Sequence, residues 1–70
     1  MKDNIYSEDG RSLRYHVSTL YITGMYETCV FREFGLKGSA VLNREYSPDK
    51  ARTFHSAAVQ ALKFSEGVIR

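Results

Sequence analysis

Features that small proteins use for stability or chemistry are scarce in this chain of 70 residues. Cys29 is the single cysteine, so no disulfide can form within the chain, and the paired ligands typical of zinc sites are missing. No apolar run approaches the roughly 20 residues that span a bilayer. Residues Met1 to Asn4 also lack the apolar stretch of a signal peptide. The sequence therefore predicts a cytoplasmic protein without a metal, a cofactor or a membrane partner.

An excess of charge of one sign is also missing. The formal net charge is +2, and ten basic residues are interspersed with eight acidic ones, a pattern typical of a solvated surface. Hydrophobic residues make up 43% of the chain, which is too apolar for a disordered protein. A domain of this size buries only roughly 60% of its unfolded surface. Self-association or a well-packed core is therefore expected to compensate.

Three segments carry the composition of β-strands. Leu13 to Ile22 is rich in β-branched and aromatic residues, and although a helical spacing also fits, this composition favours a strand. Thr23-Gly24 separates it from a second strand over Met25 to Phe34, and Gly35 to Gly38 leads into a third over Ser39 to Tyr46. Period-2 alternation places three residues of the third strand on one face: Ala40, Leu42 and Tyr46. Connections this short predict antiparallel neighbours.

A C-terminal helix follows, predicted from about Pro48 to about Ser65. Ser47 can cap its first turn, Asp49 suits the positive N-terminal end, and Lys63 suits the negative C-terminal end. Gly67 is a natural terminator. One apolar face of the helix consists of Ala51, Phe54, His55, Ala58, Val59 and Leu62.

The fold class that results is α+β, with a three-stranded antiparallel meander packed against one helix. Residues 13–70 form the single β-β-β-α domain. Residues 1–12 are either a frayed tail or an edge strand around Ile5 and Tyr6, closed by a favoured two-residue turn at Asp9-Gly10.

The same segments resemble a group of short bacteriophage and prophage proteins. Shared features are an aliphatic-Ser-Thr strand, an aromatic-Glu-Thr-Met-Val-Phe strand, and a Tyr-Ser/Thr turn before a helix with an Ala…His pair; here they are Val17 to Ile22, Tyr26 to Phe31, Tyr46-Ser47, and Ala51 with His55. Cys29 stands where methionine is usual, Phe54 replaces a glycine, and the link before Met25 is short. The resemblance implies a phage or prophage origin and supports the order of a β-meander followed by a helix, but it implies no activity.

Reactive constellations are few. Cys29 and His55 could meet if the helix packs on that face, but a lone cysteine in a strand is usually a small buried hydrophobe. A metal site from His16, His55 and Cys29 lacks a fourth ligand. Glu27 could pair with His55 in a structural role. The sequence therefore predicts no enzyme and no catalytic residue.

Two binding modes remain. Tyrosine is common at interfaces, so a tyrosine-rich sheet face opposite the helix predicts protein binding through Tyr15, Tyr21, Tyr26, Arg32 and Arg44. An ordinary exposed surface is the other interpretation of these tyrosines. The expected function is that of a small accessory protein that binds a second copy, a host protein or both, with an inhibitor of a host defence complex (anti-CRISPR or anti-restriction) as one form.

Weak nucleic-acid binding is the alternative. Aromatic residues interleaved with basic ones on a sheet are typical of single-strand binders. The candidate basic residues are Arg11, Arg14, Arg32, Lys37 and Arg44. Glutamates in the same strands would cancel much of their field.

Overall fold

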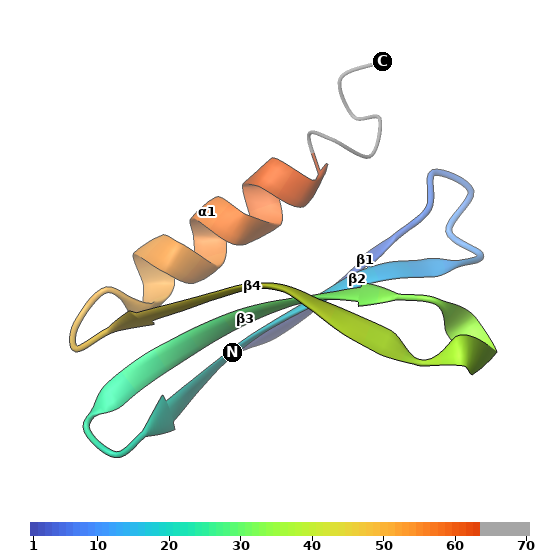
Figure 1. Cartoon of the computed structure of the whole chain (residues 1–70). Helices are drawn as coiled ribbons and strands as arrows, with labels where there is room; N and C mark the ends of the chain where they lie inside the picture. The colour runs from blue at the N-terminus through green and yellow to red at the C-terminus, as the bar shows by residue number, and fades with distance from the viewer. Residues whose placement is uncertain (64–70) are drawn as a thin grey trace.

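The computed structural model describes residues 1–63, which form a four-stranded antiparallel sheet with one helix on one face (Figure 1). The strands lie side by side in chain order. The elements are β1 (Lys2–Tyr6), β2 (Leu13–Ile22), β3 (Met25–Glu33), the short 3₁₀ helix η1 (Gly35–Lys37), β4 (Ser39–Ser47) and α1 (Ala51–Lys63). The predicted α+β meander with a C-terminal helix is confirmed, and the N-terminal segment supplies the additional edge strand.

A tight turn at Thr23 and Gly24 joins β2 to β3. Both residues have a positive φ, 48° and 83°, as in the hairpin turns whose twist matches that of the flanking strands. The turn sets a register in which Ile22 pairs with Met25. Because side chains alternate between the two faces of a strand, this register fixes the face of every residue in β2 and β3.

The connection between β1 and β2 is wider than predicted. Instead of a two-residue turn at Asp9-Gly10, a loop is closed by a hydrogen bond from Ser7 N to Ser12 O (2.8 Å). The Asp9 carboxylate accepts hydrogen bonds from Ser7 Oγ (2.6 Å) and Arg11 N (3.0 Å). An aspartate that bonds to nearby backbone in this way stabilises a local turn and competes with hairpin pairing. The predicted two-residue turn is therefore wrong.

Helix α1 begins at Ala51 rather than at Pro48. Ser47 Oγ accepts hydrogen bonds from the backbone N–H groups of Asp49 (3.2 Å) and Lys50 (2.9 Å). Both residues precede the helix, so Ser47 does not cap its first turn as predicted. These bonds organise a turn that precedes the helix. Asp49 consequently lies outside the first helical turn, which has no acidic residue, so that part of the prediction is wrong.

The C-terminal part of the helix is described as far as Lys63, which lies in the last turn as predicted. The expected end near Ser65 and the terminator Gly67 lie outside the described residues.

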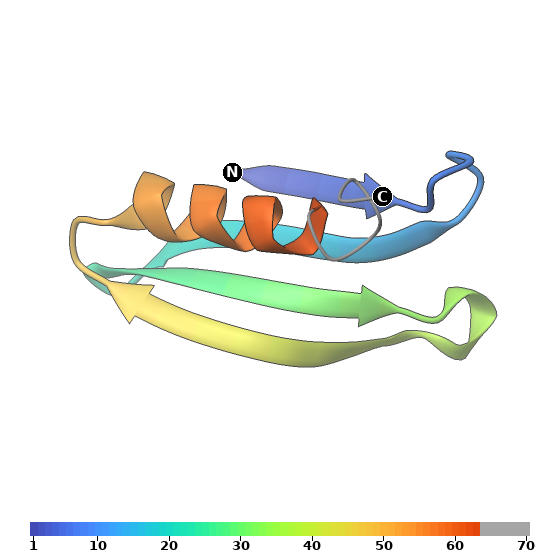
Figure 2. The ribbon, with the colours of Figure 1, turned by 90° about the horizontal axis from the view of Figure 1, so that it is seen from above.

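A small apolar core lies between α1 and the sheet. The helix packs on β2 and β3 and also on β1. Figure 2 shows it running along the β1–β2 side of the sheet, with β4 at the far edge. Val17 is fully buried, with 0% of its surface exposed. The core and the residues packed against it are Ile5, Val17, Val30, Tyr15, Ala58, Val59 and Leu62.

A bulge changes the faces of β4. The register between β3 and β4 shifts between Val30 and Phe31, so that Val30 pairs with Asn43 and Phe31 with Val41. The extra residue interrupts the alternation of side chains. Tyr46 thereby pairs with Glu27 and lies on the opposite face from Ala40. The predicted grouping of Ala40, Leu42 and Tyr46 on one face is therefore wrong.

Candidate functional site

The sheet has one face under α1 and one face that no described element covers. Thr19 and Thr28 lie on the helix side, because Thr19 bonds to both Thr28 and the helical His55. Their neighbours along each strand therefore point to the other side, which we call the open face. Exposed apolar or aromatic side chains gather there at the end of the sheet that holds the β2–β3 turn: Leu20, Ile22 and Met25, with Tyr46 beside them on β4.

An ordered polar cluster lies among these residues on the open face. The Tyr46 hydroxyl donates a hydrogen bond to Glu27 Oε2 (2.7 Å), and the Cys29 thiol donates to Glu27 Oε1 (3.3 Å). Arg44 Nε lies 3.7 Å from Glu27 Oε2. The Tyr46 hydroxyl, followed by the Cys29 thiol, holds the pKa of Glu27 below its ordinary value. Glu27 is therefore an anchored carboxylate that positions a tyrosine and an arginine.

Cys29 and His55, which could have met only if the helix packed on the side of Cys29, do not come together. Cys29 neighbours Thr28 along β3 and so points away from the helix, whereas His55 lies on the helix side. Burial raises the pKa of the Cys29 thiol above its ordinary value, which keeps it protonated and unreactive at neutral pH. Glu27 also lies on the open face, so the predicted pair of Glu27 and His55 is wrong.

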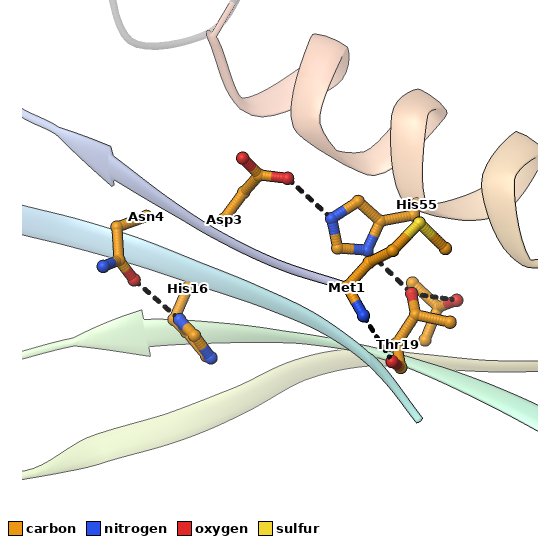
Figure 3. Close-up of polar contacts among 7 residues, drawn as sticks. Met1, Asp3, Asn4, His16, Thr19 and His55 are labelled. Carbon is orange, nitrogen blue, oxygen red and sulfur yellow. Dashed lines mark hydrogen bonds and ion pairs between the residues drawn. The ribbon is translucent and has the colours of Figure 1, made fainter. Parts of the chain in front are cut away.

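His55 instead joins two ends of the chain (Figure 3). Its Nε2 lies 2.8 Å from Asp3 Oδ2 on β1, and its Nδ1 lies 2.7 Å from Thr19 Oγ1 on β2. Thr19 Oγ1 is in turn 3.0 Å from Thr28 Oγ1 on β3. His55 and both threonines are buried. The cluster therefore satisfies polar groups between helix and sheet, and its closed-off threonine hydroxyls are inaccessible to a substrate.

The other histidine, His16, also contacts neighbouring side chains. His16 Nδ1 lies 2.7 Å from Asn4 Oδ1, and its ring is 5.9 Å from that of Phe31. Within residues 1–63, no group of three His, Cys, Asp or Glu side chains could hold a metal ion. No helix in this part of the chain has the length and apolarity needed to cross a membrane.

The five predicted interface residues lie in three places rather than on one surface. Tyr15 packs on the core under the helix, with the Arg32 guanidinium 5.2 Å from its ring centroid. Tyr21 and Tyr26 form an edge-to-face pair, with centroids 4.9 Å apart, at the other end of the same face. Arg44 alone lies on the open face. The expected tyrosine-rich face opposite the helix is therefore wrong, because those tyrosines share the face of Val17 and Thr19.

Tyr46 is one of the open-face residues that sequence reasoning missed, together with Leu20, Ile22 and Met25. The bulge in β4 reverses the face of Tyr46 relative to any period-2 count that starts at Ala40. The available signal was its spacing beside Arg44, since an i, i+2 pair shares a face within an unbroken strand.

The predicted basic residues separate into two groups. Arg11, Arg14, Arg32 and Lys37 line one cavity at an end of the sheet. Arg44 lies instead beside Glu27 on the open face. The fold therefore brings four of the five predicted basic residues together at one cavity.

Comparison with known proteins adds no identification. No protein-family model, curated protein or solved structure matches this chain.

Proposed function

We propose that this chain is a non-enzymatic protein-binding module that acts through its open face. The observation that carries the proposal is that both faces of the sheet bear apolar side chains, whereas α1 covers one of them. An antiparallel sheet with one solvated face normally alternates apolar and polar residues. Here Leu20, Ile22 and Met25 remain exposed on the side away from the helix.

The polar cluster supports the same proposal. Tyrosine and arginine are enriched in protein interfaces, and side chains held in place before binding lose less entropy. Tyr46 and Arg44 are both positioned by Glu27. An ordered polar centre beside exposed aliphatic side chains is the composition of a protein-binding surface.

The biological setting is proposed from the resemblance to short phage and prophage proteins. We propose an accessory protein that works in the bacterial cytoplasm, and an inhibitor of a host defence complex fits its size. Expression in cells with an active restriction or CRISPR system tests this setting. Protection of an incoming target plasmid would support it, and unchanged interference across several systems would contradict it.

The binding surface is tested by a matched pair of variants. Leu20→Ser removes an aliphatic side chain from the open face, whereas Leu36→Ser removes the same group from the fully exposed η1 segment. We expect Leu20→Ser to abolish self-association or retention of a stoichiometric host protein. Leu36→Ser should leave both unchanged, with circular dichroism checking that each variant folds.

Two measurements decide the outcome. Light scattering of the purified protein reports self-association, and nuclease-treated affinity capture reports a host partner. A wild-type protein that stays monomeric and retains no stoichiometric partner would contradict the proposal. If Leu20→Ser and Leu36→Ser reduce self-association or partner retention equally, the binding surface is not the open face.

A further inference from the structure

A second feature lies at the end of the sheet where the β1–β2 connection approaches η1. The last pair of the β2–β3 ladder at this end is Tyr15 and Arg32. Beyond it, residues 11–14 and 32–35 together with Lys37 line an open, concave site of about 810 Å³, which we call the cavity. Cavities of about 300–1,000 Å³ are of the size that holds small ligands.

Positive charge is concentrated around this cavity. Arg11, Arg14, Arg32 and Lys37 all line it, with Glu33 as the one acidic residue of its lining. Four of the ten basic residues of the chain therefore surround one space, although the whole chain carries a net charge of only +2. Cations gathered in a concave site favour an anionic ligand.

Arg32 and Arg14 differ in how their side chains are placed to bind such a ligand. Arg32 Nη1 donates to the backbone oxygens of Arg14 (3.2 Å) and Glu33 (3.4 Å), which fixes the guanidinium. Within residues 1–63, Arg14 Nε is the buried side-chain nitrogen or oxygen that has no hydrogen-bond partner. A buried donor without a partner is costly, and a small rotation of this side chain toward a ligand oxygen would remove that cost.

An aromatic ring lies beside the basic side chains of the cavity. Phe34 lines the cavity with 50% of its surface exposed, and the Arg32 guanidinium lies 5.3 Å from its ring centroid. Leu13 adds further apolar lining. Arginines bind phosphate oxygens through several parallel N–H groups, and an exposed aromatic ring stacks on a nucleobase.

We propose that this cavity binds a nucleoside phosphate, with phosphate groups held by Arg11, Arg14, Arg32 and Lys37 and the base against Phe34. The phosphate belongs either to a free nucleotide or to a single-stranded nucleic acid. The site goes beyond the proposed protein-binding function, because the cavity and the open face share no named residue. Either function can therefore fail without the other.

Amide chemical shifts of the wild-type protein locate the ligand without any substitution. The probes are thymidine 5′-monophosphate, an oligo(dT) of about 12 nucleotides, and thymidine as the uncharged control. We expect both phosphate-bearing probes to shift amides of residues 11–14 and 32–37, and thymidine to shift them far less. Binding of the mononucleotide identifies a free-nucleotide site, whereas binding of the oligonucleotide alone identifies a single-strand site.

A charge-matched pair of variants then tests the cations. Arg11→Gln with Lys37→Gln removes two exposed cations from the cavity, and Arg52→Gln with Lys63→Gln removes two from the exposed side of α1. Each phosphate contact to a single strand contributes about −0.7 to the slope of log affinity against log salt. Four contacts predict about a 50-fold loss of oligo(dT) affinity between about 50 and 200 mM salt. Two contacts predict about a sevenfold loss.

We expect the cavity variant to bind oligo(dT) more weakly than the wild type and to lose less affinity as the salt concentration rises. The α1 variant should match the wild type in both affinity and salt dependence. Equal effects of the two variants would mean that net charge alone attracts the oligonucleotide, and would overturn the proposal. So would chemical shift changes confined to other parts of the sheet, or no change with either phosphate probe at millimolar concentration.

Discussion

The buried contact between Thr19 and His55 allows a quantitative test of the fold. Thr19→Val keeps the shape of the side chain and removes its hydroxyl. His55 Nδ1 then loses its partner at 2.7 Å and Thr28 Oγ1 loses its partner at 3.0 Å, while both residues remain buried, with 4% and 3% of their surface exposed. An orphaned buried polar group costs about 1–3 kcal/mol. Domains of this size have a free energy of unfolding of roughly 0.05–0.15 kcal/mol per residue, so such a loss is a large fraction of the total.

A double-mutant cycle isolates the contact itself. His55→Leu removes the nitrogen that Thr19→Val orphans, and Thr19 retains its hydrogen bond to Thr28 at 3.0 Å. The penalty of the orphaned nitrogen is therefore missing from the double variant. We expect the double variant to be more stable than the sum of the single effects by about 1–2 kcal/mol. Urea unfolding followed by circular dichroism, extrapolated to water, supplies the four free energies.

An exposed pair of similar chemistry serves as the control. Asn4 and His16 are 2.7 Å apart on the open side of β1 and β2, where water can replace either partner. Their cycle, with Asn4→Val and His16→Leu, should give a coupling below about 0.5 kcal/mol. If the Thr19 and His55 effects also add within about 0.5 kcal/mol, the buried hydrogen bond does not couple helix and sheet, and the reasoning is refuted.

Three further predictions concern the open face and the helix start. Tyr46→Phe removes the largest cause of the lowered pKa of Glu27, so that pKa should rise toward 4.5 in an NMR titration of the carboxyl group. Because the folded-state pKa is lowered, the stabilisation from Glu27 is present above pH 4.5 and is lost as the pH falls, and the variant should lose part of it. An unchanged titration would contradict the hydrogen bond. Cys29 should react with a disulfide reagent at neutral pH more slowly than a free thiol, because burial raises its pKa; rapid labelling of the native protein would show otherwise. Ser47→Ala should lower the free energy of unfolding by about 1 kcal/mol, and Ser47→Thr, which keeps the hydroxyl, should recover most of it in the same urea assay.

Local interactions account for what the sequence predicted correctly. The paired residues with positive φ at the β2–β3 turn and the strand-forming composition on either side of it act over a few positions. Ser47 likewise bonds to the backbone of the next residues in the chain. The strand order, the antiparallel pairing and the C-terminal helix follow from such signals, because short connections leave few alternatives.

Tertiary structure decided on which face of the sheet each side chain lies and which face the helix covers. A single inserted residue in β4 reversed the side on which Tyr46 lies, and the placement of α1 on β2 and β3 made one sheet face a core and left the other open. The partner of His55 could not be chosen from its sequence neighbours, since Asp3 stands 52 positions away. The same holds for Arg14 and Lys37, which meet at one cavity because the strands return to the same end of the sheet. Sequence spacing sets local conformation, whereas packing between elements determines which side chains meet.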